Sequence, residues 1–201
     1  MNLWQYEKEA MMEGYTAVCG CDEAGAGPLA GPVYAAAVIL PAGVDIPGLN
    51  DSKKLSEKKR EALFPVIQEK AAAWSAAWVD NEEIDETDIL SARIKAMQLA
   101  IDGLTQAPDF ALIDGNRDHG QTAAITIPHR CVVKGDSLSA SIAAASVLAK
   151  VSRDHYMAEV AKQYPEYRFD RHKGYGTKLH YELLRAYGPS PIHRRTFLKN
   201  L

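Results

Sequence analysis

Four acidic residues follow or end stretches of the chain that we expect to be buried β-strands. Asp22 and Glu23 come directly after the first stretch, Asp114 ends a later one, and Asp136 follows a short one beyond it. Ligands in open α/β sheets gather at strand ends, so we expect these carboxylates to converge. Such a group cannot stay ionised unpaired, and Lys134 is the only basic neighbour along the chain. Mg²⁺ and Mn²⁺ prefer oxygen ligands, and two such ions about 3.5–4 Å apart are one solution for hydrolysing phosphodiesters.

Each acidic residue also has a structural interpretation, as a turn former or a helix cap. Adjacent residues on a strand point to opposite faces, so Asp22 and Glu23 share a site only if the strand breaks there. Gly25 and Gly27 supply the backbone freedom for such a break. Asp154 competes with Asp136 as the fourth carboxylate, but an ordinary ion pair on a helix face explains Asp154 as well.

The loop of Gly25, Ala26 and Gly27 is a candidate substrate-binding loop, because glycines let a nucleic-acid backbone approach the main chain closely. Its glycine spacing differs from that of the dinucleotide-binding fingerprint. A plain tight turn is the alternative.

Two basic segments are candidates for phosphate contact. Ser52, Lys53 and Lys54 lie close to the start of a predicted helix, where lysines and free N–H groups suit a phosphate. Lys173 and Tyr175 lie in a glycine-rich loop, where a cation and an aromatic ring can contact a sugar or a base. A solvated helix face and a core tyrosine are the respective alternatives.

Hydrophobic patterning predicts the elements that must position these residues. The expected strands are residues 15–21, 33–40, 74–79, 110–114 and 131–133. The expected helices are residues 56–71, kinked or split at Pro65, and residues 81–102, 138–162 and 177–187. Small residues at the start of the third helix permit close packing on a sheet. Because the first two strands look like a hairpin, the pattern favours an α/β fold with a mixed central sheet flanked by helices.

Composition restricts the class of protein. The 201 residues suffice for one domain, and no apolar run approaches the roughly 20 residues that cross a bilayer. No secretory signal is recognisable, so the expected location is the cytoplasm. Three cysteines argue against a disulfide framework, and we expect small buried residues rather than zinc ligands. Nothing points to an obligate partner chain, so we expect a monomer.

The C-terminal part of the chain is basic. Residues 162–201 carry nine Lys/Arg against three Asp/Glu, which suggests a basic face.

Taken together, the motifs resemble those of the ribonuclease HII family and run in that family's order. They are DEAGAGPLAGPV at 22–33, LNDSKKL at 49–55, LIDGN at 112–116, VKGD at 133–136, SIAAASVLAKVSRD at 141–154 and HKGYGT at 172–177. The resemblance implies an RNase H-like fold and a single type-2 catalytic domain over residues 1–201, with a basic helical substrate-binding region from about 160. It implies that Asp22, Glu23, Asp114 and Asp136 are the catalytic metal ligands.

The resemblance further implies a substrate and a mode of recognition. The substrates would be RNA–DNA hybrids and duplex DNA with embedded ribonucleotides, cut on the 5′ side of the ribonucleotide. The Gly25–Gly27 loop and Tyr175 would recognise the ribose 2′-OH, which distinguishes RNA from DNA. Ala26 departs from the Gly-Arg-Gly usual in this loop, so we expect weaker substrate binding or altered junction preference.

Two rival interpretations remain at this point. Ribonuclease HIII carries an added N-terminal domain, and about fifteen residues before the first strand are too few for it. An inactive binder of hybrids is suggested by Ala26, but a pure binder has no need of clustered acids.

Overall fold

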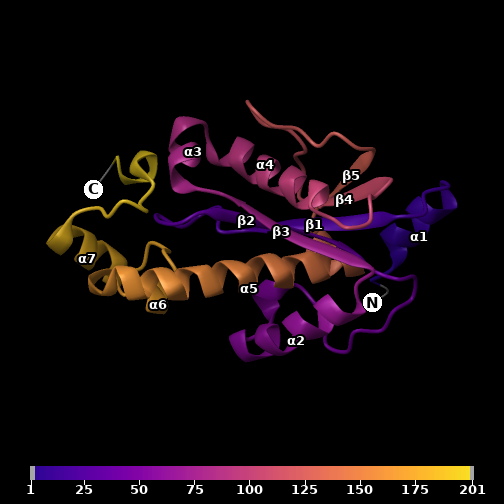
Figure 1. Ribbon diagram of the computed structural model, residues 1–201, viewed down its shortest axis with the longest axis horizontal. Coiled ribbons are helices and arrows are strands. Elements are labelled where there is room, and N and C mark those ends of the chain that lie inside the picture. The colour runs from indigo at the N-terminus through magenta and orange to yellow at the C-terminus, as the bar shows by residue number, and fades with distance from the viewer. Residues whose placement is uncertain (1–2, 200–201) are drawn as a thin grey trace.

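A five-stranded mixed sheet forms the centre of the computed structural model, which describes residues 3–199 (Figure 1). Its strands are β1 (Val18–Ala24), β2 (Val33–Ile39), β3 (Ala73–Val79), β4 (Phe110–Asp114) and β5 (His129–Val132), in the order β3-β2-β1-β4-β5. β1 and β2 form the expected antiparallel hairpin, β3 extends it, and β4 and β5 run parallel to β1. The predicted mixed sheet is therefore confirmed.

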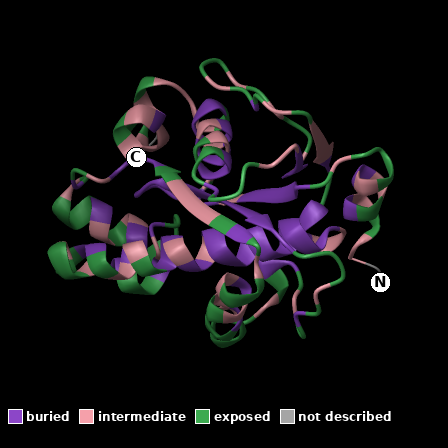
Figure 2. Cartoon of the chain, turned by 45° about the vertical axis from the view of Figure 1, so that its right-hand side comes forward, coloured by how far each residue is buried: buried purple, intermediate pink, exposed green. Residues whose placement is uncertain are grey.

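Helices cover both faces of the sheet. They are α1 (Gln5–Met12), α2 (Glu57–Lys70), α3 (Asn81–Glu86), α4 (Ile89–Asp102), α5 (Ala140–Gln163), α6 (Phe169–His172) and α7 (Lys178–Tyr187). Figure 1 shows α3 and α4 on one face, α5 and α2 on the other, and α6 and α7 beyond one end of the sheet. The buried residues concentrate in β1, β2 and β4 and in the first half of α5 (Figure 2).

The small residues of α5 let this helix press against β1, as expected. Ala140, Ser141, Ala143 and Ala144 are fully or almost fully buried. A Cβ on Gly20 of β1 would clash with the backbone of α5 at Ser141 and Ile142. The lack of side-chain volume on both elements therefore sets how close the start of α5 comes to the acidic end of β1.

The helices differ from the prediction in three ways. The single helix expected over residues 81–102 is two, because Asp88 caps α4 by accepting hydrogen bonds from the N–H groups of Leu90 and Ser91. Pro65 does not split α2, which runs from Glu57 to Lys70 as one helix. Helices α1 and α6 were not predicted at all.

The remaining elements agree with the sequence to within a few residues. The ends of the predicted domain, residues 1–2 and 200–201, lie outside the described residues. Within residues 3–199, no helix combines the length and the apolarity that a membrane span requires.

Candidate active site

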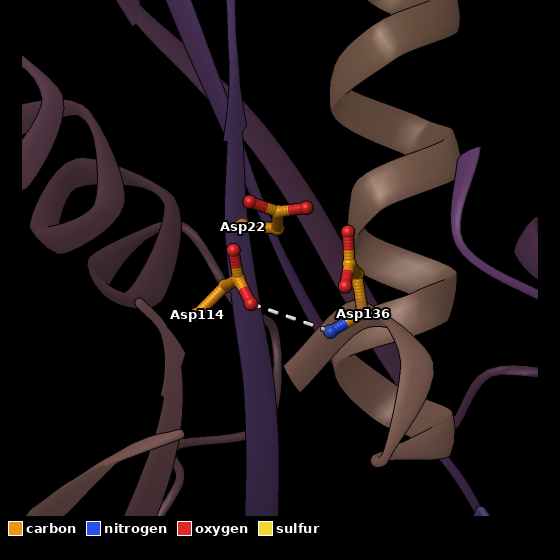
Figure 3. A group of neighbouring side chains, drawn as sticks. All are labelled: Asp22, Asp114 and Asp136. Atoms are coloured by element: carbon orange, nitrogen blue, oxygen red, sulfur yellow. Dashed lines mark hydrogen bonds between the residues drawn. The ribbon is translucent and has the colours of Figure 1, made fainter. Parts of the chain in front are cut away.

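Three aspartates from different elements converge beside the start of α5. Asp22 lies on β1, Asp114 ends β4, and Asp136 lies in the 3₁₀ turn Gly135–Ser137 that follows β5. One carboxylate oxygen of each lies within 4.8 Å of those of the other two. Figure 3 shows the three side chains around one small space. The predicted convergence is therefore observed for three of the four carboxylates.

The backbone around Asp136 is built to bring it to Asp114. Lys134 has a left-handed conformation, with a φ of 57°, which turns the chain sharply after β5. A Cβ on Gly135 would lie only 2.5 Å from a methyl group of Ile142 and 3.2 Å from an oxygen of Asp114. The Asp136 N–H then donates to Asp114 Oδ1 over 3.3 Å. Glycine at 135 thus permits the close approach of the two acids.

Glu23 lies next to this group but on the other face of β1. The strand continues through both Asp22 and Glu23, which pair with Ala36 and Ala35 of β2. The strand break that we expected does not occur, and normal alternation sends the two side chains to opposite faces. Glu23 Oε1 lies 3.6 Å from Nε of Arg93 on α4, while its buried Oε2 has no hydrogen-bond partner among the described residues.

The electrostatics of the group favour a bound cation. Burial, then the charges of Glu23 and Asp114, raise the pKa of the Asp22 carboxyl well above its usual value. Burial and Asp114 likewise raise the pKa of Asp136. Both shifts mean that, with no cation bound, the ionised carboxylates are destabilised by burial and by one another.

The basic residues beside the acidic group differ from the one that the sequence suggested. Lys53 Nζ lies 3.5 Å from Asp136 Oδ2, and Arg93 contacts Glu23, whereas Lys134 only shapes the turn. Burial acts to lower the pKa of Lys53, but the surrounding aspartates, Asp22 foremost, raise it overall. The Lys53 side chain is 73% exposed, so it screens the acids only weakly.

A hard divalent cation fits this donor set. Three aspartate oxygens close enough to share one ion, in a partly buried setting, suit Mg²⁺ or Mn²⁺, and the unpartnered Oε2 of Glu23 is a further oxygen nearby. No comparable group of three potential ligands includes a cysteine anywhere in residues 3–199. Cys19 and Cys21 are free and fully buried, as expected, and Cys131 is half-buried.

A cleft of about 230 Å³ adjoins the acidic group. Seven residues that the sequence singled out line it: Glu23, Gly25, Ala26, Gly27, Ser52, Lys53 and Tyr175. Arg60, from the basic stretch at the start of α2, and Lys150 line it as well. The Tyr175 ring is 41% exposed, with Lys150 Nζ 5.5 Å from its centroid, so the alternative of a core tyrosine is wrong.

Two candidate phosphate-binding lysines and the competing carboxylate lie outside the cleft lining. Lys54 Nζ donates to Ser137 Oγ over 3.0 Å, outside the cleft lining. Lys173 has a left-handed backbone, with a φ of 51°, and does not line the cleft either. Asp154 pairs with Lys150 over 2.6 Å on the same helix and stays apart from the three aspartates, so the ion-pair interpretation holds for it.

One further acidic residue was missed. Glu7 of α1 is 2% exposed, and its Oε1 accepts hydrogen bonds from Ser139 Oγ and from both the N–H and Oγ of Ser141. Glu7 therefore anchors the N-terminus of α5 two residues beyond the turn that holds Asp136. No local sequence signal links residues 132 positions apart.

Comparisons with known proteins agree with this architecture. The family model for ribonuclease HII matches residues 19–200. A ribonuclease HII of Caldicellulosiruptor saccharolyticus is 48% identical over 200 residues, which is all of this chain and 96% of that protein. The crystal structure of the ribonuclease H2 of Pyrococcus horikoshii OT3 has a TM-score of 0.72 at 25% identity, covering 90% of this chain and 93% of the other.

A second solved structure bears on the fold. The crystal structure of Bst-RNase HIII in complex with Mn²⁺ has a TM-score of 0.60 at 22% identity, covering 89% of this chain and 65% of the other. The mixed sheet and its flanking helices are thus the RNase H-like fold. The family match favours ribonuclease HII over the rival HIII interpretation. The chain belongs to the ribonuclease HII family of divalent-metal-dependent endonucleases, which hydrolyse RNA in RNA–DNA hybrids.

Proposed function

We propose that this ribonuclease HII cuts the phosphodiester on the 5′ side of a ribonucleotide, in RNA–DNA hybrids and in duplex DNA with embedded ribonucleotides, by two-metal-ion catalysis. The products would carry 5′-phosphate and 3′-hydroxyl ends. The observation that carries the proposal is the joining of a three-aspartate group to a cleft lined by a glycine loop, a half-exposed tyrosine and cations.

The carboxylates would hold the metal ions. Asp22, Asp114 and Asp136 offer oxygens to a shared ion, and the orphaned Oε2 of Glu23 offers a further ligand at the edge of the cleft. When bound, divalent cations lower the pKa of the attacking water and stabilise the charge on the leaving 3′ oxygen. Either Mg²⁺ or Mn²⁺ suits these oxygen donors.

The walls of the cleft would recognise the substrate. The Gly25–Gly27 loop and Tyr175 would contact the ribose and its 2′-OH, the group that DNA lacks. Ser52 and Lys53, together with Arg60 and Lys150, would contact phosphates. Roles for Lys54 and Lys173 in phosphate binding stay predictions, as does the weaker binding expected from Ala26.

The wider setting follows from this substrate. Tyr175 comes from the basic C-terminal region, so residues from about 160 onward would help to bind the duplex. We also propose that the enzyme acts in the cytoplasm and as a monomer.

A labelled DNA duplex with one ribonucleotide tests the proposal, beside an all-DNA duplex of the same sequence. We expect cutting at a single position, 5′ of the ribonucleotide, with Mg²⁺ or Mn²⁺ and none with EDTA. The upstream fragment should be extended by a DNA polymerase, because it ends in a 3′-hydroxyl. Cutting 3′ of the ribonucleotide, or equal cutting of the all-DNA duplex, would overturn it.

A further inference from the structure

Two arginines are completely buried beneath the loop that forms one wall of the cleft. Arg153 of α5 and Arg194 near the C-terminus each have no exposed surface. Buried cations are normally balanced by a carboxylate. In the part of the chain that the structure describes, neither guanidinium has a carboxylate within ion-pair distance. Both donate to backbone carbonyls instead.

Arg194 binds the loop itself. Its Nη2 donates to the carbonyl of Gly25 over 2.6 Å, its Nη1 to Ala26 over 3.0 Å, and its Nε to Gly31 over 2.9 Å. The planar fork of one guanidinium therefore sets the direction of three peptide groups in a single loop.

Arg153 ties the same loop to the segment that carries Tyr175. Its three nitrogens donate to the carbonyls of Ala30, Pro32 and Lys173 over 2.9–3.1 Å. The guanidinium carbon of Arg153 also lies 5.7 Å from the centroid of the Tyr175 ring. The two candidate recognition segments are thus held against one buried cationic layer.

The direction of these carbonyls determines what the loop offers to the cleft. In a planar trans peptide the N–H points opposite to the C=O of the same unit. Since the carbonyls of Gly25 and Ala26 point at Arg194, the N–H groups of Ala26 and Gly27 point away from it. Neither N–H donates to any group among residues 3–199, and both residues line the cleft.

The charge of Arg194 acts in the same direction. Burial, and then the positive charge of Arg153, lower the pKa of Arg194 to about 9, so it remains a cation at neutral pH. A cation behind the carbonyl ends of two peptides strengthens their N–H groups as donors to an anion or a hydroxyl oxygen. No carboxylate among residues 3–199 lies within ion-pair distance of Arg194, although the more distant charge of Asp85 acts to raise its pKa.

We propose that Arg194 is a positioning residue for substrate recognition, which fixes the Gly25–Gly27 loop so that the N–H groups of Ala26 and Gly27 face the ribonucleotide. The inference rests on the proposed role of this loop in binding the ribonucleotide.

Steady-state kinetics of Arg194→Gln and Arg194→Lys test it, with Arg195→Gln as the matched control. Arg195 is the adjacent arginine, but it is exposed. The substrate is the duplex with one ribonucleotide, and the all-DNA duplex serves as a competitive inhibitor. For Arg194→Gln we expect KM to rise about tenfold and kcat to stay within about twofold of the unaltered enzyme. The reason is that the loop would act in substrate binding and does not position the acidic residues.

The inhibition constant of the all-DNA duplex should be unchanged in Arg194→Gln, since the loss concerns the ribonucleotide alone. A merely structural role would lower kcat through the folded fraction and leave KM untouched. Arg194→Lys keeps the charge but loses the fork, so we expect a smaller rise in KM, about threefold. Arg195→Gln should weaken the binding of both duplexes slightly and to the same extent.

The outcomes separate the two proposals. If the unaltered enzyme does not discriminate the ribonucleotide from DNA, the proposed role of the loop fails. If it discriminates and Arg194→Gln keeps the same KM, the inference about Arg194 fails alone. Circular dichroism at the assay temperature comes first. If the Gln variant is unfolded there, Arg194→Lys decides, and an unchanged KM in that folded variant overturns the inference.

Discussion

At the scale of single residues, the acidic group favours metal binding at a cost in stability. Asp22 is buried against two other acids, and this raises its pKa well above the usual range. The folded protein without metal therefore carries repulsion that the unfolded chain does not. Metal binding would offset this repulsion, which is a common compromise between stability and activity.

Replacing Asp22 with Asn should therefore stabilise the protein in EDTA. We expect a rise of about 1–2 kcal/mol in the free energy of unfolding, or roughly 2–8 °C in Tm for a chain of this size, measured by thermal unfolding. Asp102→Asn, an exposed position on α4, is the control and should change Tm little. A lower Tm for Asp22→Asn would contradict the electrostatic interpretation.

The two loop glycines are required for different reasons. Gly25 has a φ of 95°, and a Cβ there would clash with the side chain of Arg153. At Gly27 a Cβ would meet nothing within 4 Å. The fold itself thus requires glycine at position 25. At position 27, only a ligand bound in the cleft would make glycine necessary.

Gly25→Ala should destabilise the protein by about 2 kcal/mol or more, since strain and overpacking add. Gly27→Ala should leave Tm unchanged but raise KM for the duplex with one ribonucleotide several-fold, because its methyl group enters the substrate's space. Thermal unfolding and steady-state kinetics of both variants give the comparison. Equal loss of stability in the two would show that Gly27 has a packing role.

At the scale of elements, α1 acts on the site through α5. The carboxylate of Glu7 satisfies N–H and hydroxyl groups at the start of α5, where a negative charge also suits the helix dipole. The same end of α5 contacts the turn of Asp136. Helix α1 therefore supports the acidic group although it contributes no residue to it.

Glu7→Ala should reduce the free energy of unfolding by about 2–3 kcal/mol, because buried donors lose a charged acceptor. Glu9→Ala on the same helix is the control. It loses a part-exposed pair with Arg130, worth about 0–1 kcal/mol, and an exposed hydrogen bond from Gln5. Urea unfolding monitored by circular dichroism measures both. A Glu7→Ala loss no larger than that of Glu9→Ala would refute the anchoring role.

The elements that the sequence predicts well are those with a strong local pattern. Apolar strands such as β4 and the small-residue start of α5 were recognised because burial on two sides leaves a continuous signal. The split between α3 and α4 was missed, because it depends on Asp88 capping α4, and Asp88 lies inside the stretch whose pattern predicted a single helix. Helix α1 was missed because its buried residues, Glu7 and Ala10, form no apolar stripe.

At the scale of the whole molecule, two histidines, His180 and His193, hold the C-terminal segments together in neutral form. The Ser190 N–H donates to His193 Nδ1, so the proton of His193 is on Nε2 and can be donated to His180 Nε2 over 2.9 Å. His180 Nδ1 then donates to the carbonyl of Tyr175. Burial lowers the pKa of both His180 and His193 to about 4.

Stability should consequently fall in mild acid. Between about pH 6.5 and pH 4 the unfolded chain binds protons at these histidines that the folded protein does not, so unfolding becomes easier as pH drops through this window. At pH 5 we expect a loss of about 2 kcal/mol from each of the two histidines relative to pH 7.5. Above pH 6.5 their contribution is constant.

Urea unfolding of the protein and of His180→Gln at both pH values isolates this contribution, since the two share every carboxylate. The pH-dependent loss should be smaller in the variant. Equal losses in both would mean that the buried imidazoles do not carry it.

The candidate site was predictable in type but not in detail. The three aspartates were identified because each was expected at or just after the end of a predicted strand, and strand ends meet at one edge of a sheet. The position of Glu23 on the opposite face and its pairing with Arg93 depend on β1 continuing, which the glycines at 25 and 27 obscured. Arg153 and Arg194 were not selected, because their partners are backbone carbonyls, which leave no trace in the sequence.

The central claim is that Asp22, Asp114 and Asp136 form the catalytic metal site. The most direct measurement is cleavage of the duplex with one ribonucleotide by Asp114→Asn, with Mg²⁺ or Mn²⁺, beside Asp102→Asn and the unaltered protein. We expect Asp114→Asn to lose at least about a thousandfold in kcat, or about 4 kcal/mol, while staying folded, and Asp102→Asn to remain fully active. Full activity of a folded Asp114→Asn protein would contradict the assignment of the site.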